Sequence, residues 1–310
     1  MSSRLFPKVS SSRFPPTNPW CLGCDKNDVA LNTACLVIVP LYRPTLDEWE
    51  KKSLRSLGLA FDSRPIAFFG PTGMRNAAAE KLVGSREWTY FPRWFFKSAY
   101  HYSWLVLSER FYSKFLDYDY ILIYQTDAFV FRDDLDGWIE AGFSYVGAPC
   151  RTRKLFGDRG YWVGNGGLSL RRVRDCVRVL RVGARRCLEG PLPPIPFRVP
   201  GGVGTLFLKL RLIMENHEFF PPSARGFVRR WSGVEDVFFG HVAPRIDQAF
   251  RVPAADLAAR FALDEYPEFF SKAFGLEHEP MGFHGLGRDN GARWNPAFWA
   301  ASVERTLRGR

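Results

Sequence analysis

The segment that most constrains the fold is a short apolar run, Ile121 to Tyr124, which ends in Gln125, Thr126 and Asp127. An apolar run of this length, bounded by polar residues, predicts a buried strand. A carboxylate at the end of such a strand needs a partner, because burying an unpaired charge is costly. Ligands of open α/β sheets bind beyond the carboxyl ends of the strands, so Asp127 is a candidate ligand for a hard divalent cation that bridges to phosphate oxygens. A structural role stays open at this point, in which Asp127 caps the next turn or pairs with an arginine.

The rest of the chain alternates between strand and helix patterns, which predicts an α/β sandwich built on a mostly parallel central sheet. The first strand, ACLVIVPLYRP from Ala34, is apolar throughout, as expected of a central parallel strand. Further strands are predicted at residues 64–69, 88–91, 121–124 and 145–148. Helices are predicted at residues 45–58, with Thr45 as N-cap, and at 73–83, 94–116, 133–141, 169–187 and 298–307. Residues 189–204 are rich in Pro and Gly and predict an irregular loop.

Length and composition favour one elaborated domain. The chain has 310 residues, of which 46% are hydrophobic, and this is enough for a core. We expect a poorly ordered tail at residues 1–30, which are rich in Ser and Pro, and a single domain over residues 31–310. The six cysteines follow no zinc-site or disulfide pattern, so we expect reduced thiols and a cytoplasmic location.

The charge balance is basic, with 43 Lys and Arg against 32 Asp and Glu, a formal net charge of +11. Such a balance suits a nucleic acid, an anionic membrane surface or a phosphorylated small substrate. No basic motif or aromatic-interleaved patch supports nucleic-acid binding, so we expect no nucleic-acid partner. The remaining expectations are a phosphorylated substrate and peripheral contact with the inner face of an anionic membrane.

Three further motifs carry candidate chemistry. The segment GYWVGNGGLSLRR at residues 160–172 contains Gly164, Gly166 and Gly167, which allow positive φ and close approach of the backbone to a ligand. Glu235 and Asp236 form an acidic pair, one of which could act as a general base. A histidine, residue 284, could share a metal with Asp127, because carboxylate oxygen and imidazole nitrogen suit Mn²⁺-like ions. Each motif also has a structural interpretation: a hairpin turn, a helix N-terminus and a hydrogen-bonded histidine.

The motifs YILIYQTDAFVF, VGAP, VGNGGLSLR, EDVFFG and GFHG occur in this order between about Leu36 and Gly285. This set resembles a bacterial glycosyltransferase-like domain family of unknown function, which is often associated with surface polysaccharide synthesis. The motifs are also similar to those of metal-dependent glycosyltransferases of the GT-A fold, which have a DxD motif, a Gly-rich loop, an xED motif and a C-terminal metal-binding histidine. The resemblance therefore implies a GT-A-like fold and transfer of a sugar from a nucleotide-sugar donor to a saccharide or glycolipid acceptor.

The resemblance also implies a role for each site residue. The metal ligands, for Mn²⁺ or Mg²⁺, would be Asp127, in the place of the second acid of DxD, and His284. Gln125 stands where the first acid of DxD is usual, and this departure puts the metal dependence in question. The other implied assignments are Asp236 as catalytic base with Glu235 beside it; Gln125, Thr126, Asp127, Val39, Pro40 and Lys97 at the donor nucleotide, with Arg43 as a further phosphate contact; and Asn165, Gly166 and Gly167 at the sugar and acceptor.

The function predicted from the sequence is therefore that of a metal-dependent glycosyltransferase. We expect it to invert the anomeric configuration, because a carboxylate base positioned at the acceptor fits a single displacement. A retaining outcome is compatible with the same residues. A nucleotidyl- or phosphotransferase would use the same metal and acids. A nucleotide- or carbohydrate-binding module without turnover is the alternative outside the enzymes, and the missing first acid of DxD supports it.

Overall fold

The structure, a computed structural model, describes residues 34–151, 160–190, 203–231 and 233–309. The tail expected at residues 1–30 and most of the loop expected at 189–204 lie outside the described residues. Within the described part, no helix is both long enough and apolar enough to cross a membrane.

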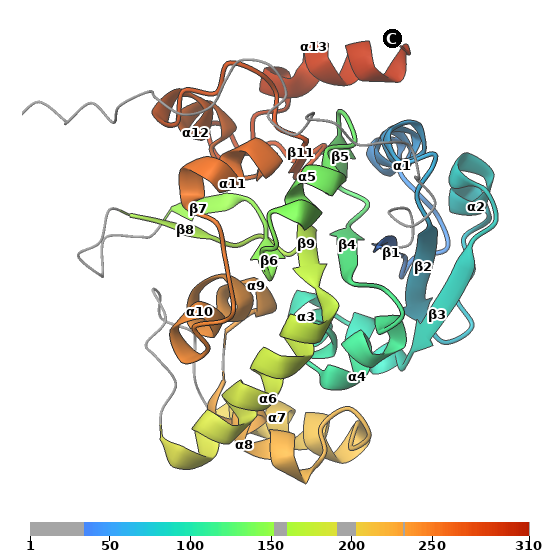
Figure 1. Cartoon of the computed structure of the whole chain (residues 1–310). Coiled ribbons are helices and arrows are strands. Elements are labelled where there is room, and N and C mark those ends of the chain that lie inside the picture. The colour runs from blue at the N-terminus through green and yellow to red at the C-terminus, as the bar shows by residue number, and fades with distance from the viewer. Residues whose placement is uncertain (1–33, 152–159, 191–202, 232, 310) are drawn as a thin grey trace, which may run out of the picture.

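The architecture is a mixed α/β fold around a six-stranded sheet in the order β3-β2-β1-β4-β9-β6 (Figure 1). Strands β3, β2, β1 and β4 are parallel, and β9 runs antiparallel to both β4 and β6. The predicted mostly parallel sheet is therefore confirmed. The strands are β1 Cys35–Pro40, β2 Ile66–Pro71, β3 Glu87–Phe91, β4 Tyr120–Tyr124, β5 Ala128–Val130, β6 Tyr145–Val146, β7 Pro149–Arg151, β8 Tyr161–Val163, β9 Leu168–Arg172, β10 Ala262–Leu263 and β11 Gly282–His284.

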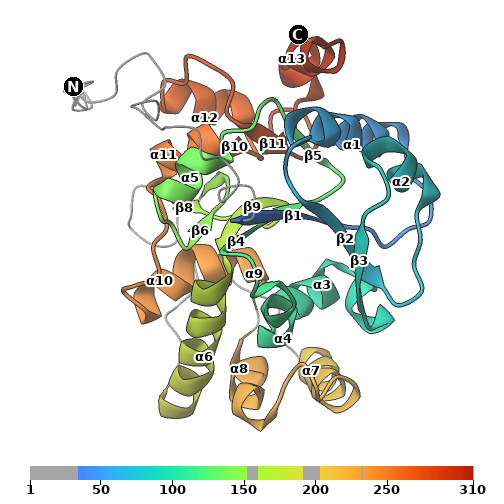
Figure 2. The ribbon, with the colours of Figure 1, turned by 45° about the vertical axis from the view of Figure 1, so that its right-hand side comes forward.

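Helices cover both faces of the sheet (Figure 2). Strand β1 shows why, because its alternate side chains enter two separate cores: Leu36 and Ile38 join one cluster, and Val37 and Val39 join the other. The first cluster packs against α3, α4 and α6, and the second against α1 and α2. The longer helices are α1 Glu48–Ala60, α2 Ala77–Val83, α3 Ala99–Val106, α5 Leu135–Glu140, α6 Val173–Glu189, α7 Val203–Glu215, α8 Arg225–Arg230, α11 Ala255–Phe261, α12 Pro267–Ala273 and α13 Pro296–Leu307, and α4 Glu109–Tyr112 is a single turn.

Short helical turns make up the remainder: the 3₁₀ turns η1 Arg93–Phe96, η2 Ser113–Phe115 and η3 Pro222–Ala224, the α-turns α9 Glu235–Val237 and α10 Ala243–Ile246, and the π-turn η4 Phe238–Val242. A second sheet, β10-β11-β5, lies beside the main one. It packs with α11, α12 and α13 around an aromatic cluster that includes Phe129, Phe283 and Trp299. In this cluster the Phe283 and Trp299 rings stack at 4.6 Å. Strand β5 follows β4 after only three residues, so the two sheets meet at the end of β4.

Three sequence predictions of local structure are wrong. The single helix expected at 94–116 is instead η1, α3, α4 and η2, because the hydroxyls of Ser98 and Ser108 each accept from the backbone N–H three residues on and start a new helix. The first helix is capped by Asp47 rather than Thr45, in a reciprocal capping box with Glu50. Residues 168–172 form β9 rather than the first turn of a helix, since Leu168 and Leu170 are fully buried against β4.

Candidate active site at the end of β4

The position of Asp127 follows from the end of β4. A tight turn over Gln125–Asp127, closed by a 2.8 Å hydrogen bond from the Ala128 N–H to the Gln125 carbonyl, leads directly into β5. Strand β5 pairs with β11 in a register that places Ala128 opposite His284. The Asp127 carbonyl also accepts the N–H groups of Gly285 and Leu286, at 2.8 and 2.7 Å. Sheet pairing therefore brings Asp127 and His284 together, although they are far apart in the sequence.

The Asp127 carboxylate is shared between two cationic groups. Its Oδ1 lies 2.9 Å from Nε2 of His284, and its Oδ2 accepts from the guanidinium of Arg288. Burial alone would raise the pKa of Asp127, but His284 and Arg288 hold it well below its usual range. Asp127 therefore has the partners that its burial requires, His284 and Arg288. The pairing with an arginine is the structural role that the sequence analysis left open.

The histidine is oriented from its other side. Asp264, which follows β10, places Oδ1 3.3 Å from Nδ1 of His284 and accepts at 3.0 Å from the indole N–H of Trp294. Burial alone would lower the pKa of His284, but the Asp127 and Asp264 carboxylates raise it to about 10. The result is a buried chain of charges, Asp264–His284–Asp127–Arg288, that ends at the partly exposed Arg288.

The glycine-rich loop between β8 and β9 packs directly on this chain. The Gln125 N–H donates to the Gly167 carbonyl at 2.7 Å, continuing the β4–β9 pairing beyond Tyr124. A Cβ on Gly167 would lie 2.1 Å from Nε2 of His284, and a Cβ on Gly166 would lie 2.2 Å from Oε1 of Glu235. The two glycines are required because neighbouring side chains occupy the space of a Cβ.

Positive φ, which the sequence assigned to the glycines of this loop, is instead found at Asn165, with φ 62°. The Asn165 side chain accounts for this conformation, since its Oδ1 accepts the Gly167 N–H at 2.9 Å in a local turn. Its amide nitrogen lies 3.0 Å from Nδ1 of His284. Asn165 therefore links the loop to the histidine.

The acidic pair lies on the other side of the loop, at the start of α9. Glu235 is buried, accepts from the Ser103 hydroxyl at 2.5 Å, and lies 3.8 Å from the guanidinium of the fully buried Arg171. Burial, with repulsion from Glu235, raises the pKa of Asp236 to about 7. The Asn165 N–H interacts with the Asp236 carboxylate, which ties the pair to the loop. Burial and the neighbouring carboxylate thus bring the pKa of Asp236 to near neutral pH.

The other predicted donor residues divide into two groups. Pro40 and Thr126 line a small pocket together with Leu41 and Tyr42, at the ends of β1 and β4. At this pocket the Thr126 hydroxyl and the Arg43 guanidinium both bind Oε1 of Glu50, at 2.7 and 2.6 Å.

Val39 and Lys97 lie away from this pocket. The Val39 side chain is fully buried in the core below it, so only its backbone could face a ligand. Lys97 is exposed at the end of η1, and no contact in the described structure joins it to Asp127 or His284.

Asp127, Gln125 and His284 are the residues that would hold a divalent ion at this place. Asp127 Oδ1 and Gln125 Oε1 lie 2.9 and 3.2 Å from Nε2 of His284, so two oxygens and one nitrogen meet at one point. Among the described residues, no group of three His, Cys, Asp or Glu side chains is placed to hold a metal. Mg²⁺ and similar ions commonly use one or two carboxylates and take their other ligands from water and phosphate, so this small set is sufficient. Arg288 would have to yield Oδ2 of Asp127 if both oxygens were used.

Sequence reasoning missed Asp264, Arg288, Ser103 and Arg171. Asp264 follows the apolar residues Ala262 and Leu263, the same strand-end signal that identified Asp127, and could have been found. Nothing in the sequence pairs Arg288 with Asp127, because that contact depends on the β5–β11 register.

Solved structures similar to this chain include glycosyltransferases. They include GlyE of Streptococcus pneumoniae TIGR4 in its apo form, at 12% identity and a TM-score of 0.43, with 89% of this chain and 62% of that chain covered. Another is the galactosyltransferase LgtC in complex with donor and acceptor sugar analogues, at 10% identity and a TM-score of 0.45, with 87% and 95% covered. A third is mouse xyloside xylosyltransferase 1 in its apo form, at 10% identity and a TM-score of 0.43, with 82% and 97% covered.

No curated protein matches the sequence. One family model does, over residues 85–284, a stretch that contains Gln125, Asp127, the Gly-rich loop, the acidic pair and, as its last residue, His284. The chain belongs to this family, which is described as a protein of unknown function (DUF5672).

Proposed function

We propose that this protein is a GT-A-like glycosyltransferase that moves a sugar from a nucleotide-sugar donor to a hydroxyl of a saccharide or glycolipid acceptor. The observation that carries the proposal is the convergence of four separate motifs at the end of β4: Gln125–Asp127, the loop at Asn165–Gly167, Glu235–Asp236 and His284. Ligands of α/β folds bind beyond the carboxyl ends of parallel strands, where these groups lie. The resemblance to polysaccharide-synthesis proteins suggests surface polysaccharide or glycoconjugate synthesis as the setting.

The donor would bind across the ends of β1 and β4. Pro40 and Thr126 border a small pocket there, and the exposed Tyr42 ring beside it could stack on a nucleoside base. Asp127 and His284, with the Gln125 amide oxygen, would hold Mn²⁺ or Mg²⁺. The ion would neutralise the negative charge that develops on a diphosphate leaving group. Arg288, half-exposed next to Asp127, would supply a further positive charge to the diphosphate.

Asp236 is the better candidate for the general base. A base is most effective when its pKa lies near the working pH, and the pKa of Asp236 is raised to about 7. Glu235 is occupied by Ser103 and faces Arg171, which suits a positioning role beside Asp236. Asp236 would take the proton of the acceptor hydroxyl as that oxygen attacks the anomeric carbon, and the nucleoside diphosphate would leave. A single displacement of this kind inverts the anomeric configuration.

The test is a thermal-shift screen of nucleoside diphosphates and nucleotide sugars, with and without Mn²⁺. A ligand present at about a hundred times its Kd should stabilise the protein by about 2.7 kcal/mol. We expect a metal-dependent shift with one nucleotide, lost in Asp127→Asn and kept in the matched control Asp62→Asn, whose side chain is exposed on the surface after α1. A shift that persists in Asp127→Asn would remove Asp127 from the donor site.

Two features favour the binding module without turnover. Both carboxylate oxygens of Asp127 already have protein partners, and Gln125 replaces the first acid of DxD. Incubation with the donor identified by the screen separates the possibilities. Release of a nucleoside diphosphate supports sugar transfer and release of pyrophosphate supports nucleotidyl transfer, whereas binding without any product supports the module.

A further inference from the structure

Positive charge is concentrated in one lobe of the molecule. The lobe comprises residues 172–190 and 203–231, which form α6, α7, η3 and α8. It carries eleven Lys and Arg against four Asp and Glu, and so holds much of the excess of 43 basic over 32 acidic residues in the whole chain. Figure 1 shows it at the end of the molecule opposite α13. A local excess of this size creates a positive potential over one face.

Part of this charge has no carboxylate partner in the described part of the chain. Arg178 pairs with Asp175 and Asp247, and Arg181 pairs with Glu109, all near the main sheet. The arginines at the far end of the lobe have no carboxylate partner among the residues that the structure describes. These are Arg185 and Arg186 on α6 and Arg225 and Arg229 on α8, all of them exposed.

Large apolar side chains are exposed on α6 and α7 of the same lobe. Leu188, at the end of α6, is 69% exposed, and Met214, on α7, is 78% exposed. Leu208 and Leu210 of α7 are exposed as well. Single exposed leucines are common on protein surfaces, but several at one end of a lobe indicate a binding surface.

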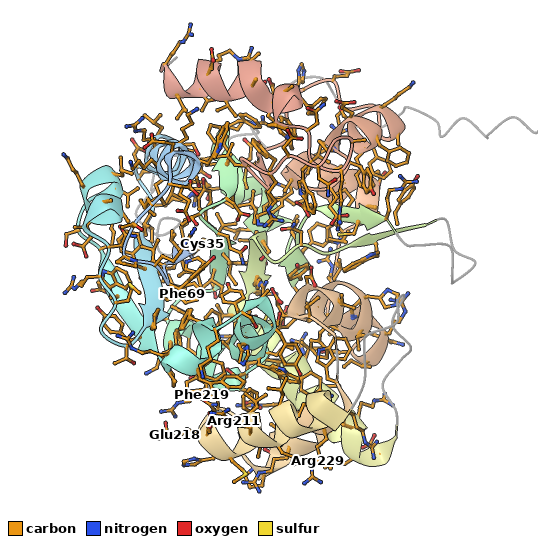
Figure 3. The ribbon with its side chains drawn as sticks, turned by 180° about the vertical axis from the view of Figure 1, so that it is seen from behind. Cys35, Phe69, Arg211, Glu218, Phe219 and Arg229 are labelled. Atoms are coloured by element: carbon orange, nitrogen blue, oxygen red, sulfur yellow. The ribbon has the colours of Figure 1, made fainter. Side chains whose placement is uncertain are left out.

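The three helices of the lobe are joined by direct contacts. Leu188 leans on α8, where its Cδ2 would lie 3.3 Å from a Cβ on Gly226, and Arg230 donates to the Gly190 carbonyl at 2.7 Å. Lys209 donates at 3.1 Å to the Arg229 carbonyl, which joins α7 to α8. Figure 3 labels Arg211 of α7 and Arg229 of α8 at the same end of the molecule.

We propose that this lobe binds the surface of an anionic lipid bilayer. A lobe that exposes both apolar side chains and arginines without a carboxylate partner among the described residues matches the chemistry of that surface, because the apolar groups enter the boundary between headgroups and acyl chains while arginines bind lipid phosphates. A nucleic acid would use the arginines but leave Leu188 and Met214 exposed to water. A symmetric contact with a second copy would place the same arginines against one another, which is repulsive. The proposal is independent of the transfer chemistry.

The experiment is flotation of the full chain with vesicles of phosphatidylcholine alone or of phosphatidylcholine mixed with phosphatidylglycerol. We expect binding to the mixed vesicles only, weakening as ionic strength rises. The double variants Leu188→Asp/Met214→Asp and Arg185→Glu/Arg229→Glu should each bind at least about tenfold more weakly. The matched control is Arg55→Glu/Leu59→Asp, which makes one change of each kind on the exposed face of α1 and should bind like the wild type.

Three outcomes would overturn the proposal. They are equal or absent binding to the two kinds of vesicle, loss of binding in the α1 control as large as in the lobe variants, and a wild-type dimer that Leu188→Asp/Met214→Asp converts to a monomer. The last would identify the lobe as a contact between copies of the chain. Thermal unfolding of each variant shows that it is folded before binding is compared.

Discussion

Gly167→Ala tests the packing on which the candidate site depends. The backbone of Gly167 has an ordinary φ, so alanine is allowed there and the change acts through its methyl group alone. That Cβ would lie 2.1 Å from Nε2 and 2.3 Å from Cδ2 of His284. The imidazole cannot retreat freely, because Asp264 and Asn165 contact Nδ1 on its other side.

The expected destabilisation follows from these distances. Non-bonded heavy atoms settle at about 3.5 Å, so the ring has to move by about 1.4 Å, which breaks its 2.9 Å contact with Asp127. Overpacking a dense interior costs about 1–3 kcal/mol, and losing a hydrogen bond to a charged group costs about 1.5–3 kcal/mol. Gly167→Ala should therefore lower the free energy of unfolding by about 3 kcal/mol or more, a large part of the stability of a typical domain.

Urea unfolding followed by tryptophan fluorescence measures this change as a lower midpoint at an unchanged slope. The control is Gly58→Ala in α1, whose Cβ would meet Val83 Cγ1 at an ordinary 3.7 Å. Alanine is the better helix former, so this control should be neutral or up to about 1 kcal/mol more stable. A wild-type midpoint for Gly167→Ala, with the control as expected, would refute the close contact between the loop and His284.

Three other predictions concern the same residues. Ser103→Ala leaves the buried Oε2 of Glu235 without its hydroxyl donor and should cost about 1–3 kcal/mol in urea unfolding, whereas the exposed Ser113→Ala should be neutral; equal effects would contradict this. Asp264→Asn should lower the pKa of His284 from about 10, as measured by NMR titration of the imidazole, and an unchanged value would remove Asp264 as its partner. The pKa of Asp236, raised to about 7, predicts a contribution to stability that is present below about pH 4 and lost as pH rises through 7. Asp236→Asn should remove this pH dependence of stability. Once the donor is identified, the same variant should also abolish sugar transfer, whose rate in the wild type should rise through pH 7. A variant with the wild-type pH profile would exclude Asp236 as the titrating group.

The sequence by itself determined the class of fold and the positions of the candidate motifs. The apolar runs at β1, β2 and β4 are strong local signals, because a parallel strand buried on both faces must be apolar throughout. The strand-end position of Asp127 follows from the same signal. Local patterns predicted helix boundaries less well where polar residues set them. Ser98 and Ser108 are examples, because their caps divide the aromatic segment 94–116 into several helices.

Only the tertiary structure decided which side chains meet. The β5–β11 register places His284 beside Asp127, and the β4–β9 pairing places Gly167 beside Gln125. These contacts join residues far apart in the chain, and the sequence pattern around each residue is the same whether or not the partner is near. The same limit explains why Arg288 was missed, whereas Asp264 carries a strand-end signal that the sequence does show. Strand pairing is a long-range property, set by the packing of the whole sheet, whereas apolar periodicity is set by the few residues around each position.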